Sequence, residues 1–418
     1  MAKYMKTEQG YIDIPNFAIA PFKPEGKSYL TFSSLNNFTL AVNDTTKHWD
    51  STLEYFASDK TWTTWDGTSA LSAVADDGEY VLYLRGTGNT VITGNDVNRK
   101  WILTGTDIAC VGNIENLLDY KTVESGAHPT LADFCYSWMF QGCTALTQAP
   151  SLPATTLADS CYMRMFQDCT ALAQAPALPA TTLVPNCYSL MFWRCTALTQ
   201  APSLPATTLA VSCYSHMFED CTALTHAPSL PATVLADSCY SGMFRGCTAL
   251  TQAPSLPATT LAFSCYSYMF RGCTALTQAP LLSATTLANY CYSHMFEGCT
   301  ALTQVPLLPA TTLAVSCYGG MFWRCTSLKF SSTQTDEYTQ EYRIPSSGNG
   351  TTAISALYDM FTSTSGTFTG TPEINTTYYL SSDNMIVRET DIATLNGYVG
   401  SMINTALNSI GVAEEGAY

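Results

Sequence analysis

The most regular feature of the hydrophobic pattern is a unit of 26 residues that recurs eight times between residues 131 and 330. Each unit begins with an apolar cluster of the form CYxxMFxxC and continues with a segment of the form TALTQAPSLPATTL. On a helical wheel the apolar side chains of the cluster fall within an arc of about 140°, which predicts a short amphipathic helix. The β-branched residues and prolines of the second segment predict a short strand and an extended return. A period of this length is typical of a solenoid, in which each unit buries its apolar face against its neighbours.

The residues before the repeats carry a different pattern. Residues 28–115 contain short runs of alternating apolar and polar residues, punctuated by Asn, Asp and Gly. Such runs predict short strands, and they favour a small β-sandwich-like domain. Residues 1–27 are rich in proline and aromatic residues, and we expect an extended N-terminal arm there. The solenoid itself should then occupy residues 116–330.

The residues after the repeats fall into two segments. Residues 331–382 contain ALYDMF at 356–361, which keeps the spacing of the CYxxMF cluster and so predicts a degenerate capping region. Residues 383–418 have apolar residues at three- and four-residue steps, which predicts a C-terminal helix or attachment segment. The expected fold class is therefore α+β: an N-terminal β-sandwich-like domain, a solenoid of eight repeats, a C-terminal cap and a helix.

Composition and charge restrict the classes of partner that the chain can bind. Only 12% of the residues are charged, and 33 acidic residues against 18 Lys and Arg give a net charge of -15. This charge would repel a phosphate backbone, so we expect no nucleic acid partner. No apolar stretch is long enough for a membrane helix, so we expect no membrane insertion. The N-terminus lacks the pattern of a secretory signal, which favours synthesis in a host cytoplasm and another route out of the cell.

Sixteen of the seventeen cysteines belong to the repeats and form two series with a step of 26 residues. One interpretation is a metal or redox ladder; the other is that the thiols pack as small buried apolar groups. The two cysteines of one unit would lie about 12 Å apart along a helix, beyond the reach of a disulfide. No CxxC pair and no zinc-type spacing with histidine occurs. We predict reduced core thiols and neither a bound metal nor a cofactor.

Four positions of the unit vary between copies: two before the first cysteine and three, six and seven after it. On the helical wheel they lie opposite the apolar arc. They could form a solvated face that is free to drift, or a recognition surface, because Trp, Tyr and Arg are enriched at binding hot spots. The candidate ligand-binding residues are Trp138, Arg164, Trp193, Arg194, His216, Arg245, Tyr268, Arg271, His294, Trp323 and Arg324.

The motif MFxxCTALTQAPxLPATTLxxxCYxxMF resembles the BspA-like leucine-rich repeats of gut bacteria and their phages. The resemblance implies that the solenoid is a leucine-rich-repeat solenoid. It is unspecific for function, because a repeat fold hosts many roles.

The sequence contains no recognisable catalytic motif, and its five histidines are scattered, so we predict that the chain is not an enzyme. We expect a structural or adhesive protein, and we expect it to be a phage virion appendage such as a fibre or host-recognition protein. Its partners would be a host-surface receptor or polysaccharide, and other virion proteins contacted through the arm or the C-terminal helix; homo-oligomerisation is left open. A bacterial cell-surface adhesin is the alternative, and an intracellular interaction scaffold is third.

Overall fold

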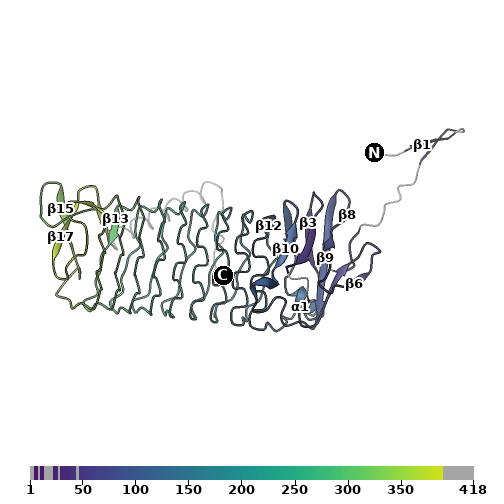
Figure 1. Ribbon diagram of the computed structural model, residues 1–418, viewed down its shortest axis with the longest axis horizontal. Helices are drawn as coiled ribbons and strands as arrows, with labels where there is room; N and C mark the ends of the chain where they lie inside the picture. Colours follow the sequence, from purple (N-terminus) through teal and green to yellow (C-terminus); the bar gives the residue numbers. More distant parts are fainter. Residues whose placement is uncertain (1–3, 8–9, 14–21, 27–28, 44–46, 389–418) are drawn as a thin grey trace, which may run out of the picture.

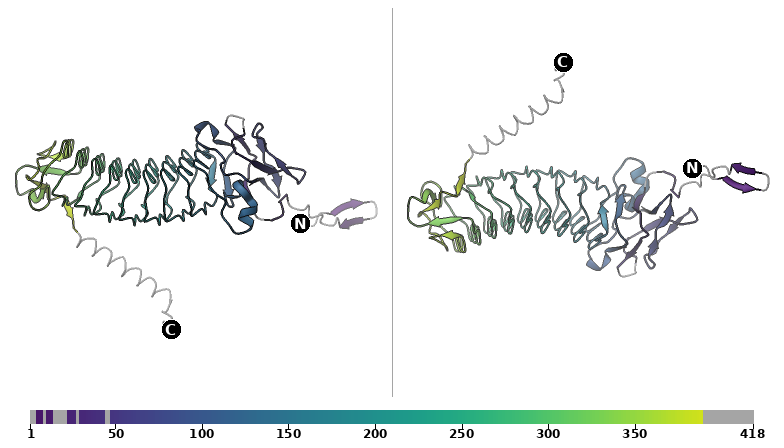
Figure 2. Two further views of the ribbon diagram at one scale, coloured as in Figure 1. Left: turned by 90° about the horizontal axis from the view of Figure 1, so that it is seen from below. Right: turned by 90° about the horizontal axis from the view of Figure 1, so that it is seen from above.

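The computed structural model describes residues 4–7, 10–13, 22–26, 29–43 and 47–388. Its described part is elongated, with β-strands of the N-terminal region at one end, the repeats in a row, and a C-terminal group of strands at the other end (Figures 1 and 2). Strands β1 (Tyr4–Thr7) and β2 (Gly10–Asp13) pair antiparallel and form a separate two-stranded sheet.

The N-terminal region forms two further sheets. The larger has seven strands: β3 (Leu30–Ser34), β5 (Thr52–Phe56), β6 (Trp62–Thr64), β8 (Val74–Asp76), β9 (Glu79–Thr87), β11 (Ile108–Val111) and β12 (Leu146–Gln148). The smaller has the order β10-β4-β7, with bounds Trp101–Thr104, Thr39–Val42 and Leu71–Ser72. Alternate residues of β3 and β4 are buried in one apolar core, as expected for strands with one covered face. A short 3-10 helix, η1 (Val97–Arg99), and the helix α1 (Asn116–Glu124) complete this region.

The cysteine-containing part of each repeat is a series of tight turns. In the first unit, the N–H groups of Cys135, Ser137 and Met139 each donate to the carbonyl three residues earlier, at 3.2 Å. The third residue of every second turn has a positive φ, as at Trp138 (57°) and Gly142 (76°). A positive φ at that position is the signature of a type II turn. We call this turn segment of one unit a rung.

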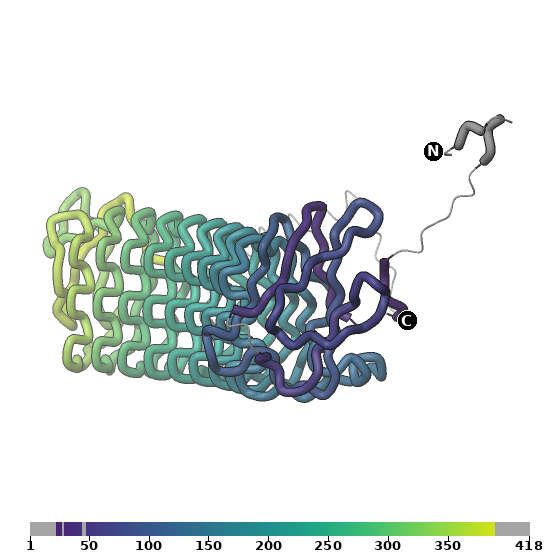
Figure 3. The backbone as a smooth tube through the Cα atoms, turned by 45° about the vertical axis from the view of Figure 1, so that its right-hand side comes forward, coloured from purple at the N-terminus to yellow at the C-terminus, as the bar shows by residue number. Residues whose placement is uncertain are grey.

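Successive rungs are joined by backbone hydrogen bonds and by stacked rings. The N–H groups of the residues that alternate with these turn donors bond to carbonyls of the next unit. Tyr136 N–H donates to the Cys161 carbonyl at 2.8 Å, and Phe140 N–H donates to the Met165 carbonyl at 2.9 Å. The Phe rings of neighbouring rungs stack with centroids 5.6 to 5.8 Å apart through the eight units. Figure 3 shows the units lying side by side in one register, which we call the repeat array.

The predicted fold class is therefore wrong. Helix α1, with nine residues, is the only α-helix in the part of the chain that the structure describes, and the fold consists mostly of several small sheets and turns. No solenoid built from a strand and a helix is found, and the helix expected after residue 388 lies outside the described residues. The reason is geometric. Pairs of apolar residues that recur every four residues lie on one face of a helix. The same spacing also arises in a series of turns in which two side chains point into the core and the next two point outward.

The C-terminal region lies at the far end of the repeat array. Strands β14 (Lys329–Ser331), β15 (Tyr338–Arg343), β16 (Ser365–Gly366) and β17 (Thr377–Ser381) form a sheet in the order β15-β17-β14-β16. Strand β18 (Met385–Val387) pairs parallel with β13 (Gln304–Pro306) of the array. Residues 353–364 form a ninth rung, whose Ala356 carbonyl accepts from Tyr318 N–H at 2.9 Å.

Candidate functional site

The candidate residues lie at the third, sixth and seventh positions after the first cysteine of each unit, and we call these positions the variable face. Every residue at the third position has a positive φ, from 53° at His294 to 61° at Gly242 and Gly320. The backbone of the rung thus turns each of these side chains out of the core. Nine candidates are half-buried, and only Arg194 and Arg324 are exposed. The half-buried ones are Trp138, Arg164, Trp193, His216, Arg245, Tyr268, Arg271, His294 and Trp323.

Two buried carboxylates, those of Glu219 and Glu297, each lie close to two basic residues of this face. Glu219 lies 2.6 Å from Nδ1 of His216 and 3.1 Å from Arg245 of the next unit. Glu297 lies 3.0 Å from both His294 and Arg271, the latter from the preceding unit. Neither carboxylate stood among the candidates. The signal that could have found them is the spacing of opposite charges, because Glu219 and Arg245 are 26 residues apart, as are Arg271 and Glu297.

Glycines of the neighbouring units make room for the two histidines. A Cβ atom on Gly242 would collide with the imidazole of His216, and one on Gly320 would collide with that of His294. Burial lowers the pKa of His294, and its attraction to Glu297 only partly offsets this. The loss of contact with water therefore favours the neutral form of the His294 imidazole.

The aromatic rings of the variable face are covered by their neighbours. The Tyr268 and His294 rings stack at 5.0 Å with an interplanar angle of 5°, and the Trp323 ring lies 5.8 Å from His294. Four arginine guanidinium groups lie over rings of this face at 4.7 to 5.6 Å: Arg164 and Arg194 over Trp193, Arg271 over Tyr268, and Arg324 over Trp323. Each of these three rings, of Trp193, Tyr268 and Trp323, therefore has a guanidinium group over it within the array.

Trp138 differs from the other aromatic residues of the variable face. It is half-buried, and within the described residues it makes neither a ring-stacking contact nor a cation–π contact. Arg194 lies between Asp168 and Asp220, at 3.8 and 3.7 Å, whereas Arg324 forms no ion pair within that part of the chain. Trp138 therefore lacks the ring contacts, and Arg324 lacks the ion pairs, that other members of the face make.

The cysteines serve the core. All seventeen are buried and free. The second cysteine of a unit donates its thiol proton to the Phe carbonyl of the preceding unit, as from Cys195 to Phe166 and from Cys221 to Phe192, both at 3.1 Å. Burial raises the pKa of the Cys143 thiol to about 12. Among the described residues no group of three His, Cys, Asp or Glu side chains is arranged to hold a metal ion.

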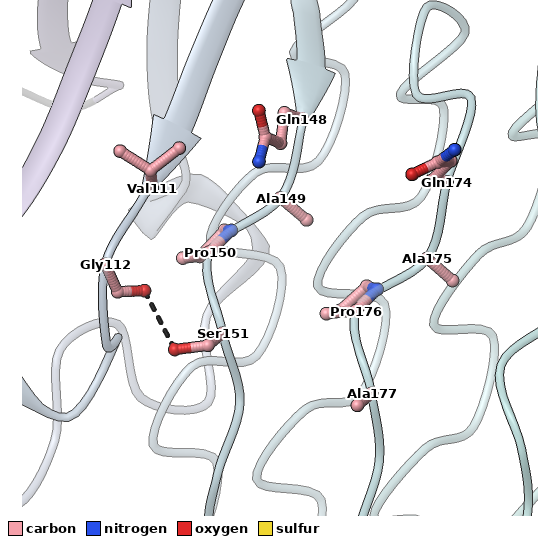
Figure 4. Close-up of a pocket in the computed structure, with 10 residues that line it drawn as sticks. All are labelled: Val111, Gly112, Gln148, Ala149, Pro150, Ser151, Gln174, Ala175, Pro176 and Ala177. Atoms are coloured by element: carbon pink, nitrogen blue, oxygen red, sulfur yellow. Dashed lines mark hydrogen bonds between the residues drawn. The ribbon is translucent and has the colours of Figure 1, made fainter.

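A shallow hollow of about 320 Å³ lies away from the variable face, where β11 and β12 meet the second unit (Figure 4). Its lining includes Gln148, Gln174 and small residues of the Ala-Pro segments. Ser151 Oγ donates to the Gly112 carbonyl at 3.0 Å. None of the lining side chains carries a charge, so the hollow offers amide and carbonyl groups to a neutral ligand and no acid or base.

Comparison with known proteins gives no relative. No protein-family model matches the chain, and no curated protein or solved structure matches it either. Within the described residues, no helix has the length and apolar character needed to cross a membrane.

Proposed function

We propose that the chain is a non-enzymatic structural and adhesive protein, in which the repeat array holds the variable face at a fixed register for a binding partner. The observation that carries this proposal is the contrast between the two sides of a rung. The inward side repeats the same Cys, Tyr, Met and Phe residues, whereas the outward side changes from unit to unit and gathers Trp, Tyr, His and Arg. All five arginines between residues 131 and 328 lie on this face. Such residues are enriched at binding hot spots.

The setting that we propose is a phage virion, with the protein as a fibre or other host-recognition appendage. The support is the motif's resemblance to BspA-like repeats of gut bacteria and their phages. The partner would be a polysaccharide or a protein receptor on the host surface. A bacterial cell-surface adhesin is the alternative, since the same face could serve either setting, and an intracellular scaffold is third.

The covered ring faces bear on how a ligand would bind. A sugar that stacks on an aromatic ring needs one free ring face, and two guanidinium groups, those of Arg164 and Arg194, lie over the Trp193 ring. We therefore expect contact through the guanidinium groups, and through Trp138, over whose ring no guanidinium group lies within the described residues. Hydrogen bonds from arginine to sugar hydroxyl or carboxylate groups fit this arrangement.

The test is binding of the full chain to host cells and to purified capsular polysaccharide. We would replace Trp138, Trp193, Tyr268 and Trp323 together by Ser, and we expect a loss of at least about 30-fold in affinity, because a hot-spot residue contributes about 2 kcal/mol or more. The matched control replaces Tyr290, an exposed aromatic residue at a position of the unit that is not among the four variable ones, by Ser.

Circular dichroism must show that both variants keep the fold. Unchanged binding by the first variant, or equal losses in both, would contradict a binding role for the variable face. Such a result would leave the array as a spacer.

A further inference from the structure

The two ends of the repeat array differ in their backbone hydrogen bonding. At the N-terminal end the β-strand region supplies the donors that a preceding rung would supply. Ile92 N–H donates to the Cys135 carbonyl at 2.9 Å, and Trp101 N–H donates to the Met139 carbonyl at 2.8 Å. Trp101 also takes the place of a core Phe, since its ring lies 6.0 Å from Phe140. This end is closed.

At the C-terminal end the last rung, residues 353–364, has only part of its donors satisfied. Phe361 N–H donates to the Gly370 carbonyl and Asp359 N–H to Thr371 Oγ1, both at 2.9 Å. The next two donors along the same edge, the N–H groups of Leu357 and Ser355, have no acceptor within the described residues. Pro372, which has no N–H group, follows Thr371, and residues 371–374 line a hollow together with this part of the rung.

The uncovered part of this edge borders a hollow with both polar and apolar lining residues. A space of about 550 Å³ is lined by residues 352, 353 and 355–358 and by residues 371–374, among them the carboxylate of Glu373. Beside it, Ile354 is 78% exposed and Tyr358 is 61% exposed. Large apolar side chains next to unpaired backbone donors are the features of an edge that another chain can extend.

The direction of the hydrogen bonds restricts the occupant. The carbonyls of the last rung point back into the array, as the Tyr358 carbonyl accepts from Gly320 N–H at 2.8 Å. The edge therefore offers donors only. Two identical ends cannot pair about a two-fold axis, because donors would face donors, so an association through this edge joins two different surfaces. The Gly370 carbonyl shows that the backbone of another segment supplies a suitable acceptor to this edge.

We infer that this edge binds the β1–β2 hairpin of a second copy and joins copies end to end. The hairpin pairs with no other strand in the described part of the chain, so its outer edges present free carbonyls. A two-stranded hairpin by itself is only marginally stable in water, and docking would stabilise it. Only residues 14–21 separate the hairpin from Phe22 of the N-terminal region, and eight residues span at most about 29 Å. The eight units of the array lie between that region and the edge, so the copy that fills the edge is a different one. Repetition of this contact forms a linear fibre.

The experiment measures the mass of the full chain by light scattering and sedimentation as its concentration rises. The edge variant is Ile354→Glu, and its matched control is Val234→Glu, since Val234 is 75% exposed on the side of the array. The hairpin variant carries Met5→Pro and Ile12→Pro, two residues that pair across the hairpin. Proline removes ladder donors and disrupts the pairing.

We expect wild type and Val234→Glu to form a series of growing oligomers, and the edge and hairpin variants each to remain monomeric. A mixture of the two variants should form a one-to-one dimer and stop there, because one copy keeps a hairpin and the other keeps an edge. A wild-type chain that stays monomeric, a closed dimer, or oligomers that survive Ile354→Glu would overturn the inference.

Discussion

Replacement of Phe218 by Ala tests the stacking of rungs most directly. Phe218 is fully buried in the fourth unit, and its ring stacks on Phe192 at 5.6 Å and on Phe244 at 5.8 Å. Truncation of a buried Phe costs about 3 to 5 kcal/mol, through lost burial and the cavity left behind. Each stacked pair contributes about 0.5 to 1.5 kcal/mol beyond burial. Because two pairs are lost at once, we expect a value near the upper end, about 4 to 5 kcal/mol.

The matched control is Phe263→Ala. Phe263 is 46% exposed and makes one edge contact with Tyr290, at 5.7 Å between ring centroids. Its loss should cost about 1 kcal/mol or less, as for partly exposed residues in general. The assay is urea unfolding followed by circular dichroism and tryptophan fluorescence, whose transitions should coincide if unfolding is cooperative. The reasoning is refuted if Phe218→Ala costs less than about 2 kcal/mol or no more than Phe263→Ala.

Two further predictions follow from the titratable groups. Burial raises the pKa of Cys143 and Cys213 to about 12, so at pH 8 we expect the native thiols to resist iodoacetamide. All seventeen thiols should react in guanidinium chloride. Rapid labelling of several native thiols would contradict the burial of the cysteines in the core. His294 faces Glu297, Arg271 and Asp359, and its pKa is lowered in the folded protein. The contribution of His294 to stability is therefore present above its unfolded pKa of about 6.5 and is lost as the pH falls through the lower folded pKa. Urea unfolding of wild type and His294→Asn between pH 8 and about 5 should show the steeper loss in wild type, and parallel curves would contradict it.

The sequence by itself determined the period and the inward residues of the repeat array. A spacing of 26 residues defines the units, and the cluster CYxxMFxxC identifies side chains that the structure buries, such as Phe218 and Cys221. The sequence misled about conformation, because a helix and a series of turns both place residues at a four-residue spacing on one side. The turn conformation is stabilised by hydrogen bonds to residues about 26 positions away. A pattern within a few neighbouring residues does not contain these long-range contacts.

Only the tertiary structure decided the chemistry of the variable face and of the array's ends. Position on a wheel placed Glu219 on an outer face, whereas stacking of rungs buries it between His216 and Arg245. The same stacking places two arginine guanidinium groups over the Trp193 ring. The open donors of Ser355 and Leu357 arise because the ladder runs in one direction and its last rung has no successor, a property of the assembled array that no single unit possesses.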